Sequence, residues 1–155
     1  MDQATRHFIR PSFIARAVNR FCGWLTSFGG GPSYSYLLQV KGRKTGQTRS
    51  VPVNVLRHNH KLFLVATRGH TQWSRNAFAD GRVILKKGRV QLEFGLRVLP
   101  DAEKPEILKE YLTRFNWMVR RFFPVPADSP LAAFVGIADR YPVFELWRLA
   151  EARAR

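Results

Sequence analysis

The amino-acid sequence predicts an α+β fold, a small antiparallel barrel with helices at its edges. Short segments rich in β-branched and aromatic residues recur along the chain, and most are separated by only a few turn-forming residues. This spacing is typical of hairpin-linked strands. Segments with helical periodicity interrupt the series. A doubly wound parallel sheet would instead need a helix between successive strands, so the pattern disfavours it.

Size and charge limit the functions to consider. The 155 residues are 45% hydrophobic, and we expect a single domain over 1–155, with a helix and turn in 1–33 and the barrel in 34–149. The chain has 26 Lys and Arg against 11 Asp and Glu, a net charge of +15. Such an excess predicts an anionic partner: nucleic acid, an anionic membrane surface, or a phosphorylated or polycarboxylate ligand.

Cysteine content and hydropathy indicate the compartment. Cys22 is the single cysteine, so the chain forms no internal disulfide and a reducing, cytoplasmic setting is expected. No apolar run approaches the roughly 20 residues that cross a bilayer.

An amphipathic helix is predicted near the N-terminus, with Ser12 as its N-cap and the glycines of 29–31 at its end. Two interpretations remain open for this helix. It packs on the domain core, or its arginines face lipid phosphates at the inner face of the membrane, as a peripheral contact. Its apolar stripe is Ile14, Val18, Phe21, Leu25 and Phe28.

Six strands follow from the pattern. His58, Asn59 and His60 lie at a hairpin turn, and Gly88 turns the chain between two later strands. The predicted strands are 34–40, 51–57, 61–67, 82–87, 89–99 and 143–149.

Three helices are predicted between these strands. A short one covers 70–80 and ends at Gly81, and another short one covers 131–138. Asp101 is expected to cap a long helix that runs to about residue 122. Trp117 and Trp147 lie in segments that suggest burial. The apolar stripe of the long helix is Leu108, Leu112, Phe115, Val119 and Phe122.

The loop 41-KGRKTGQTRS-50 carries four cations and no acid between two predicted strands. Gly42 and Gly46 would let backbone N–H groups approach an anion. Lys44 supplies a point charge, and Arg49 can make a bidentate contact. The loop therefore suits a phosphate, and the alternative is a solvated hairpin turn.

Several segments together resemble one family, the deazaflavin (coenzyme F420)-dependent nitroreductases, also called F420H2-dependent quinone reductases. They are YLLQVKGRKTGQTRSVPVNVL at 36–56, LVATRG at 64–69, Trp73 and Asn76 at W-x-x-N spacing, and YPVFELWR at 141–148. The resemblance implies a split β-barrel, in agreement with the strand pattern. It also implies that coenzyme F420 is the cofactor, with FMN as the alternative, and relatives of this fold bind heme or fatty acids.

The resemblance further implies a cofactor site. The phosphate would lie on the basic loop, the ring over the strand that begins at Val51, and the remaining residues around them. The polyanionic phosphodiester and oligoglutamate tail of F420 match the excess of cations. The implied cofactor-binding residues are Arg43, Lys44, Thr45, Gly46, Arg49, Pro52, Val53, Val65, Thr67, Arg68, Trp73 and Asn76.

The implied reaction is hydride transfer from the reduced deazaflavin to a hydrophobic acceptor, either a quinone, an enone or a nitroaromatic. Tyr141, Tyr36 and Thr67 are the side chains of suitable type to protonate the product, and no metal site is expected. The protein would act as a monomer or homodimer. Two other classes stay open: a peripheral lipid-binding protein, and a nucleic-acid-binding module. Against the latter, the aromatic residues do not alternate with cations along one strand.

Overall fold

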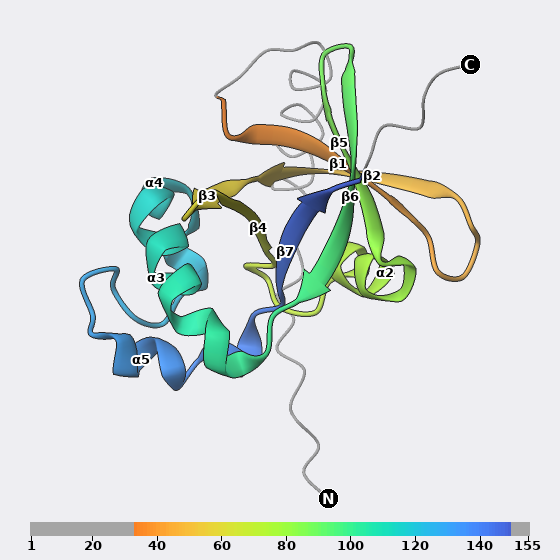
Figure 1. The fold of residues 1–155 in the computed structure, drawn as a ribbon. Helices are drawn as coiled ribbons and strands as arrows, with labels where there is room; N and C mark the ends of the chain where they lie inside the picture. Colours follow the sequence, from red (N-terminus) through yellow and green to blue (C-terminus); the bar gives the residue numbers. More distant parts are fainter. Residues whose placement is uncertain (1–32, 150–155) are drawn as a thin grey trace, which may run out of the picture.

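A computed structural model describes residues 33–149 of the chain. Its strands form one antiparallel sheet in the order β2-β1-β5-β6-β7-β4-β3 (Figure 1), which confirms the predicted α+β split barrel. The strands are β1 (Ser35–Lys41), β2 (Thr48–Asn54), β3 (Leu56–His58), β4 (Lys61–Val65), β5 (Arg82–Lys87), β6 (Val90–Val98) and β7 (Val143–Arg148).

The sheet has seven strands where the sequence predicted six, because the predicted strand 51–57 is divided at Val55. β2 and β3 lie at opposite ends of the strand order, yet only Val55 separates them along the chain. One residue spans only about 3.3–3.6 Å. The two edges must therefore lie close together, and the sheet curls into a half-barrel. The Val55 N–H donates to the carbonyl of Tyr34 (2.9 Å), outside the regular ladder.

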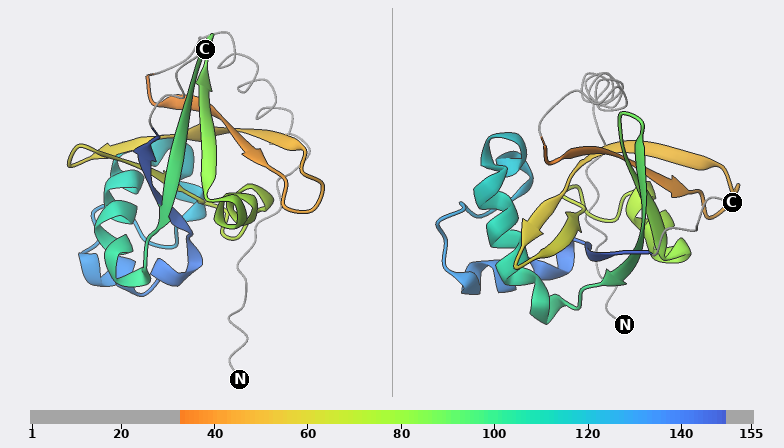
Figure 2. Two further views of the ribbon diagram at one scale, coloured as in Figure 1. Left: turned by 45° about the vertical axis from the view of Figure 1, so that its right-hand side comes forward. Right: turned by 45° about the horizontal axis from the view of Figure 1, so that its top comes forward.

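The helices lie on two sides of this curled sheet (Figure 2). The short helix α2 (Gln72–Asp80) lies on one side, capped by the Thr71 side chain and ended by Gly81 in the left-handed conformation. The other side is covered by α3 (Lys104–Arg114), α4 (Asn116–Val119) and α5 (Leu131–Val135), with single 3-10 turns η1 (Asp101–Glu103), η2 (Arg120–Phe122) and η3 (Ala138–Arg140).

The long helix predicted over 102–122 is interrupted, and three expectations about this segment and the tryptophans are corrected. Phe115 ends α3 with φ −110° and ψ 23°, and the chain restarts as α4. Phe115 is 1% exposed, whereas Trp117 is 74% exposed, so the predicted burial of Trp117 is wrong. Trp147 is also half exposed. Asp101 does not cap the helix; it forms an ion pair with Lys104 (2.7 Å).

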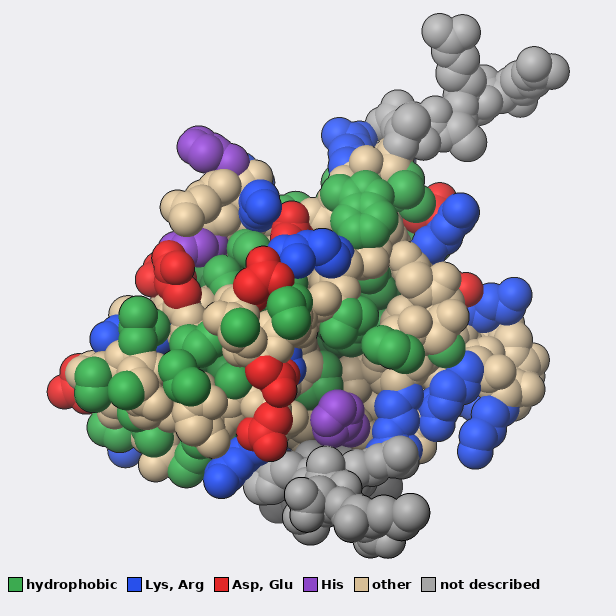
Figure 3. Space-filling view, turned by 60° about the horizontal axis from the view of Figure 1, so that its bottom comes forward, with side chains coloured by type: hydrophobic (Ala, Val, Ile, Leu, Met, Phe, Trp, Pro, Cys, Tyr) green, Lys and Arg blue, Asp and Glu red, His purple; other side chains and the backbone are tan. Residues whose placement is uncertain are grey.

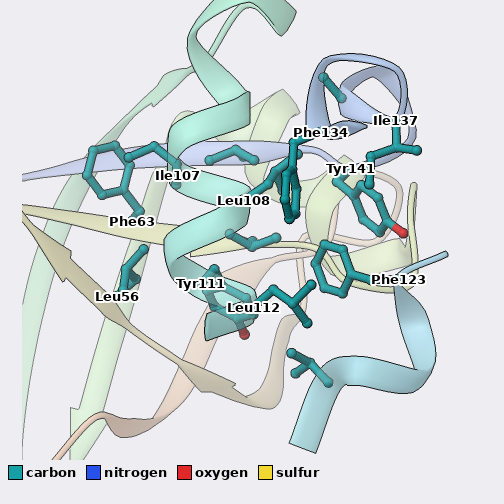
Figure 4. Close-up of a cluster of buried hydrophobic side chains, with 14 of the residues drawn as sticks. Leu56, Phe63, Ile107, Leu108, Tyr111, Leu112, Phe123, Phe134, Ile137 and Tyr141 are labelled. Atoms are coloured by element: carbon teal, nitrogen blue, oxygen red, sulfur yellow. The ribbon is translucent and has the colours of Figure 1, made fainter. Parts of the chain in front are cut away.

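Two apolar clusters hold the elements together. One lies between the helices and the sheet (Figure 4), and the other lies inside the curled sheet. β4 contributes to both, because Phe63 and Val65 face the helices while Leu64 faces the barrel interior. Burial on both faces explains why the predicted strand 61–67 has an almost continuous apolar run rather than an alternating one.

The predicted N-terminal helix lies outside the described residues. Among residues 33–149, no helix has the length and apolar character needed to cross a membrane.

Candidate functional site

A cavity of about 760 Å³ opens between β2, α2 and the segment from α3 to η2. All of the sequence-predicted cofactor-binding residues except Gly46 line it. The complete lining is Ser35, Gly42, Arg43, Lys44, Thr45, Arg49, Ser50, Val51, Pro52, Val53, Asn54, Val65, Thr67, Arg68, Thr71, Gln72, Trp73, Asn76, Tyr111, Met118, Val119, Arg121 and Phe122.

The basic loop is a tight turn between β1 and β2 that depends on its two glycines. The Gly42 N–H donates to the Gln47 carbonyl (2.7 Å), and the Gly46 N–H donates to the Gly42 carbonyl (2.9 Å). Gly46 has φ 72°, and a Cβ on Gly42 would lie 3.1 Å from the Gln47 carbonyl oxygen. Both glycine N–H groups are therefore used within the loop, and the glycines shape it. Their expected role, to let other backbone N–H groups approach an anion, stays a prediction. The N–H groups of Lys44 and Thr45 have no acceptor within residues 33–149 and are available to a ligand.

Arg43 fastens this loop to α2. Its guanidinium Nη1 donates to Gln72 Oε1 (2.9 Å) and Asn76 Oδ1 (2.8 Å), and its backbone N–H donates to the same Asn76 oxygen (3.2 Å). Asn76 is only 5% exposed. Arg43 and Asn76 thus hold the loop in place, a function that the W-x-x-N spacing alone does not reveal.

Lys44 and Arg49 are the cations of this loop that are left for a ligand. Both are exposed at the cavity, and within the described residues neither forms an ion pair or a side-chain hydrogen bond. Figure 3 shows Lys and Arg side chains gathered on the side toward which the β1–β2 hairpin extends, while acidic side chains lie mostly elsewhere on this face. The electrostatic character of this end of the cavity favours an anion.

Apolar strand residues form the middle of the cavity. Pro52 and its neighbours belong to β2, an edge strand, where the missing proline N–H removes no ladder hydrogen bond. Trp73 reaches the cavity from α2 with its ring 5.9 Å from that of Phe144 in the barrel core. These surfaces suit a flat ring system.

The opposite end of the cavity contains residues that the sequence did not indicate as site residues: Tyr111, Met118, Arg121 and Phe122. Tyr111 is 3% exposed, and burial raises its pKa above the ordinary value, while a hydrogen bond with Asn54 acts in the opposite direction. A tyrosine hydroxyl is neutral at physiological pH even at its ordinary pKa, so that of Tyr111 can act as a hydrogen-bond donor at the cavity wall. One signal was present in the sequence: Tyr111 lies three residues after Leu108, on the buried side of the predicted helix.

Of the three candidates for protonating the product, Thr67 lines the cavity, and Tyr36 and Tyr141 do not. Tyr141 is fully buried, and its hydroxyl donates to the Phe122 carbonyl (2.5 Å) while its ring stacks on Phe123. Burial raises the pKa of Tyr141 to about 12. Tyr36 packs at the margin of the barrel cluster with Lys87 over its ring (5.1 Å). Neither tyrosine lines the cavity, so a part for either in protonating the product stays a prediction.

Tyr141→Phe distinguishes a structural from a chemical role. The substitution removes the hydroxyl that donates a hydrogen bond to the Phe122 carbonyl. We therefore expect the free energy of unfolding, measured by urea denaturation, to fall by about 1–2 kcal/mol. The rate of the reduction that the family resemblance implies should stay within a few-fold of wild type. A loss of that rate by orders of magnitude, with stability unchanged, would show that Tyr141 takes part in the chemistry.

Comparisons with known proteins agree with this geometry. No curated protein matches the sequence at a significant level. A solved F420-H2-dependent reductase (FDR-A) is 26% identical over 74% of this chain and 95% of its own, with a TM-score of 0.50. A structure described as a domain-swapped dimer is 21% identical over 87% of this chain and 97% of its own, with a TM-score of 0.52. A FAD-binding protein from Mesorhizobium loti is 13% identical over 84% of this chain and 89% of its own, with a TM-score of 0.50.

The last two likenesses show the fold alone. The family model for F420H(2)-dependent quinone reductases matches residues 14–119, which include the basic loop, β2, α2 and the start of the helical side of the cavity. On that match, the chain belongs to the F420H(2)-dependent quinone reductase family.

Proposed function

We propose that this protein transfers a hydride from reduced coenzyme F420 to a hydrophobic acceptor, a quinone being the first choice among quinones, enones and nitroaromatics. Family membership makes the protein an oxidoreductase with F420 as its cofactor. The observation that carries the proposal is the cavity described above, which has cations without an ion-pair partner among residues 33–149 at one end and an apolar middle. A nucleic acid would need no such enclosed apolar volume.

The residues present fit the cofactor. Lys44, Arg49 and the available amides of the loop would hold the phosphate, because a cation and fixed N–H donors both favour an anion. The strand residues of the middle would face the deazaflavin ring, and Trp73 would flank it. The hydrogen bonds from Arg43 to Asn76 keep the loop at the cavity. The groups that would donate hydrogen bonds to the phosphate are therefore positioned before the cofactor binds.

When bound, F420H2 would supply the hydride, and the chain supplies position, shielding and hydrogen-bond donors to the acceptor oxygen, whose proton comes from solvent. Apolar side chains from β2 and Val119 exclude water from the volume where the acceptor would lie. The reduced quinone also needs a proton on oxygen. The hydroxyls of Thr67 and Tyr111 are the neutral donors at the cavity wall that we assign to hold that oxygen.

The test is turnover of 2-methyl-1,4-naphthoquinone by the purified protein with F420H2. Turnover is monitored as the oxidation of F420H2 by absorbance. We expect turnover with F420H2, and none with NADPH alone or with reduced FMN in place of F420H2. Robust NADPH-driven reduction without added cofactor, or binding of FMN in preference to F420, would overturn the proposal.

A further inference from the structure

Two arginines flank one aromatic ring at the end of the cavity opposite the basic loop. The guanidinium carbon of Arg68 lies 5.1 Å from the centroid of the Phe122 ring, and that of Arg121 lies 4.8 Å from it. Arg68 follows β4 and Arg121 belongs to η2, so the fold brings the two cations together from distant parts of the chain. All three side chains line the cavity.

This pair has no acidic partner within residues 33–149. Neither arginine forms an ion pair there, and none of the residues that line the cavity is Asp or Glu. Burial and then the charge of Arg121 lower the pKa of Arg68 from its ordinary value. Two like charges beside a partly enclosed volume create a site that an anion stabilises.

The pair is separate from the phosphate-binding cations proposed above. In Figure 1, α4, which leads directly into η2, lies on the opposite side of the molecule from the turn of the β1–β2 hairpin. Both regions nevertheless line one cavity. A cofactor and an acceptor that together fill this cavity would therefore meet positive charge at both ends and apolar surface between them.

We propose that Arg68 and Arg121 bind a carboxylate, and that the acceptor is a quinone-type molecule carrying one. Arginine suits this role because its planar guanidinium donates two parallel hydrogen bonds to a carboxylate. Phe122, Met118 and Val119 provide the apolar surface for the ring that bears this group. The inference rests on the proposed function. That function does not specify the charge of the acceptor, and the inference assigns it a negative charge. The same chemistry has a second source, the oligoglutamate tail of F420 itself.

A matched pair of acceptors tests the inference. The 3-(2-carboxyethyl) derivative of 2-methyl-1,4-naphthoquinone and its primary amide have nearly the same shape and differ in charge. With F420-saturated wild-type protein, we expect kcat/KM to be about tenfold higher for the acid, as one charge-assisted contact predicts. In Arg121→Gln this preference should fall to about one.

Arg120→Gln is the matched control, because Arg120 is the exposed neighbour in η2 and does not line the cavity. It removes the same charge and should keep the preference for the acid. An equal loss in both variants would reduce the effect to general surface charge and overturn the inference. Arg68→Gln should behave like Arg121→Gln, provided that its urea midpoint shows a folded protein.

The source of the carboxylate is resolved by binding of F420 with and without its oligoglutamate tail. If Arg121→Gln weakens only the tailed cofactor and leaves both acceptors unchanged, the arginine pair holds the tail and the acceptor assignment is wrong. If neither acceptor preference nor tail affinity changes, the carboxylate site itself is refuted.

If the proposed function is wrong, the outcome differs from a failure of the carboxylate site alone. The wild-type protein would then neither bind F420 nor turn over either quinone. Titration of the acid and the amide against tryptophan fluorescence, which Trp73 at the cavity should report, still measures the site in that case. Tighter binding of the acid that is lost in Arg121→Gln would support the carboxylate site, and equal binding of both compounds would refute it.

Discussion

Lys44→Ala and Arg49→Ala are each expected to weaken F420 binding by roughly ten- to hundredfold. Each variant removes one charge-assisted hydrogen bond to the phosphate, worth about 1.5–3 kcal/mol, and 1.4 kcal/mol corresponds to about tenfold in affinity. Because both side chains are exposed and unpaired within residues 33–149, the free energy of unfolding should change by less than about 0.5 kcal/mol. Fluorescence titration with F420 and urea denaturation measure the two quantities.

Lys86→Ala and Arg89→Ala are the matched controls, since they remove the same charges from β5 and from the β5–β6 turn, which do not line the cavity. They should alter affinity much less, acting only through long-range charge. The titrations should be repeated at two salt concentrations, because a diffuse positive field is screened more than a docked phosphate. Equal weakening in all four variants that disappears in salt would mean that the loop binds no phosphate.

Phe115→Ala should lower the free energy of unfolding by about 3–5 kcal/mol, the usual cost of removing a large buried aromatic side chain. Phe115 lies at the break between α3 and α4, with its ring 4.9 Å from those of both Tyr34 and Tyr111. The loss is large against a total stability of about 5–15 kcal/mol for a typical domain. Because Tyr111 lines the cavity, the variant should also bind quinones more weakly in its folded fraction.

Trp117→Ala is the control for this prediction, because it removes an exposed aromatic side chain instead of a buried one. Trp117 is an aromatic residue two positions further on, but it is 74% exposed, so its removal should change stability by about 0.5 kcal/mol or less. Urea denaturation of both variants gives the comparison. If the tryptophan variant lost as much stability as the phenylalanine variant, the helix would continue through residue 115 without the break.

Local patterns predicted much of the fold and the basic end of the cavity. Strands with turn residues between them are recognised from a few consecutive positions, and so is the cationic loop. The division of the predicted strand at Val55 was not visible, because Val55 is itself a good strand residue. It leaves the ladder only because the chain there passes from one edge of the sheet to the other.

The far end of the cavity could not be predicted for a related reason. In an unbroken helix, Phe122 would continue the buried stripe of Phe115, and Arg121 would face solvent. The interruption at Phe115 changes the direction of the chain, so η2 turns both residues to the cavity. Likewise, the meeting of Arg43 with Asn76 joins positions 33 residues apart, which no local pattern encodes.

The position of β7 has a consequence for synthesis of the chain. This strand, the last along the described residues, lies between β6 and β4 in the sheet. Before residues 143–148 leave the ribosome, β2-β1-β5-β6 and β4-β3 can form only as two separate ladders, each with an open edge. Such edges are liable to pair with other chains, so the nascent protein is vulnerable to aggregation until β7 emerges. Stalling of translation shortly before Val143 should therefore yield chains that need chaperone protection, although all of the cavity-lining residues have already been made.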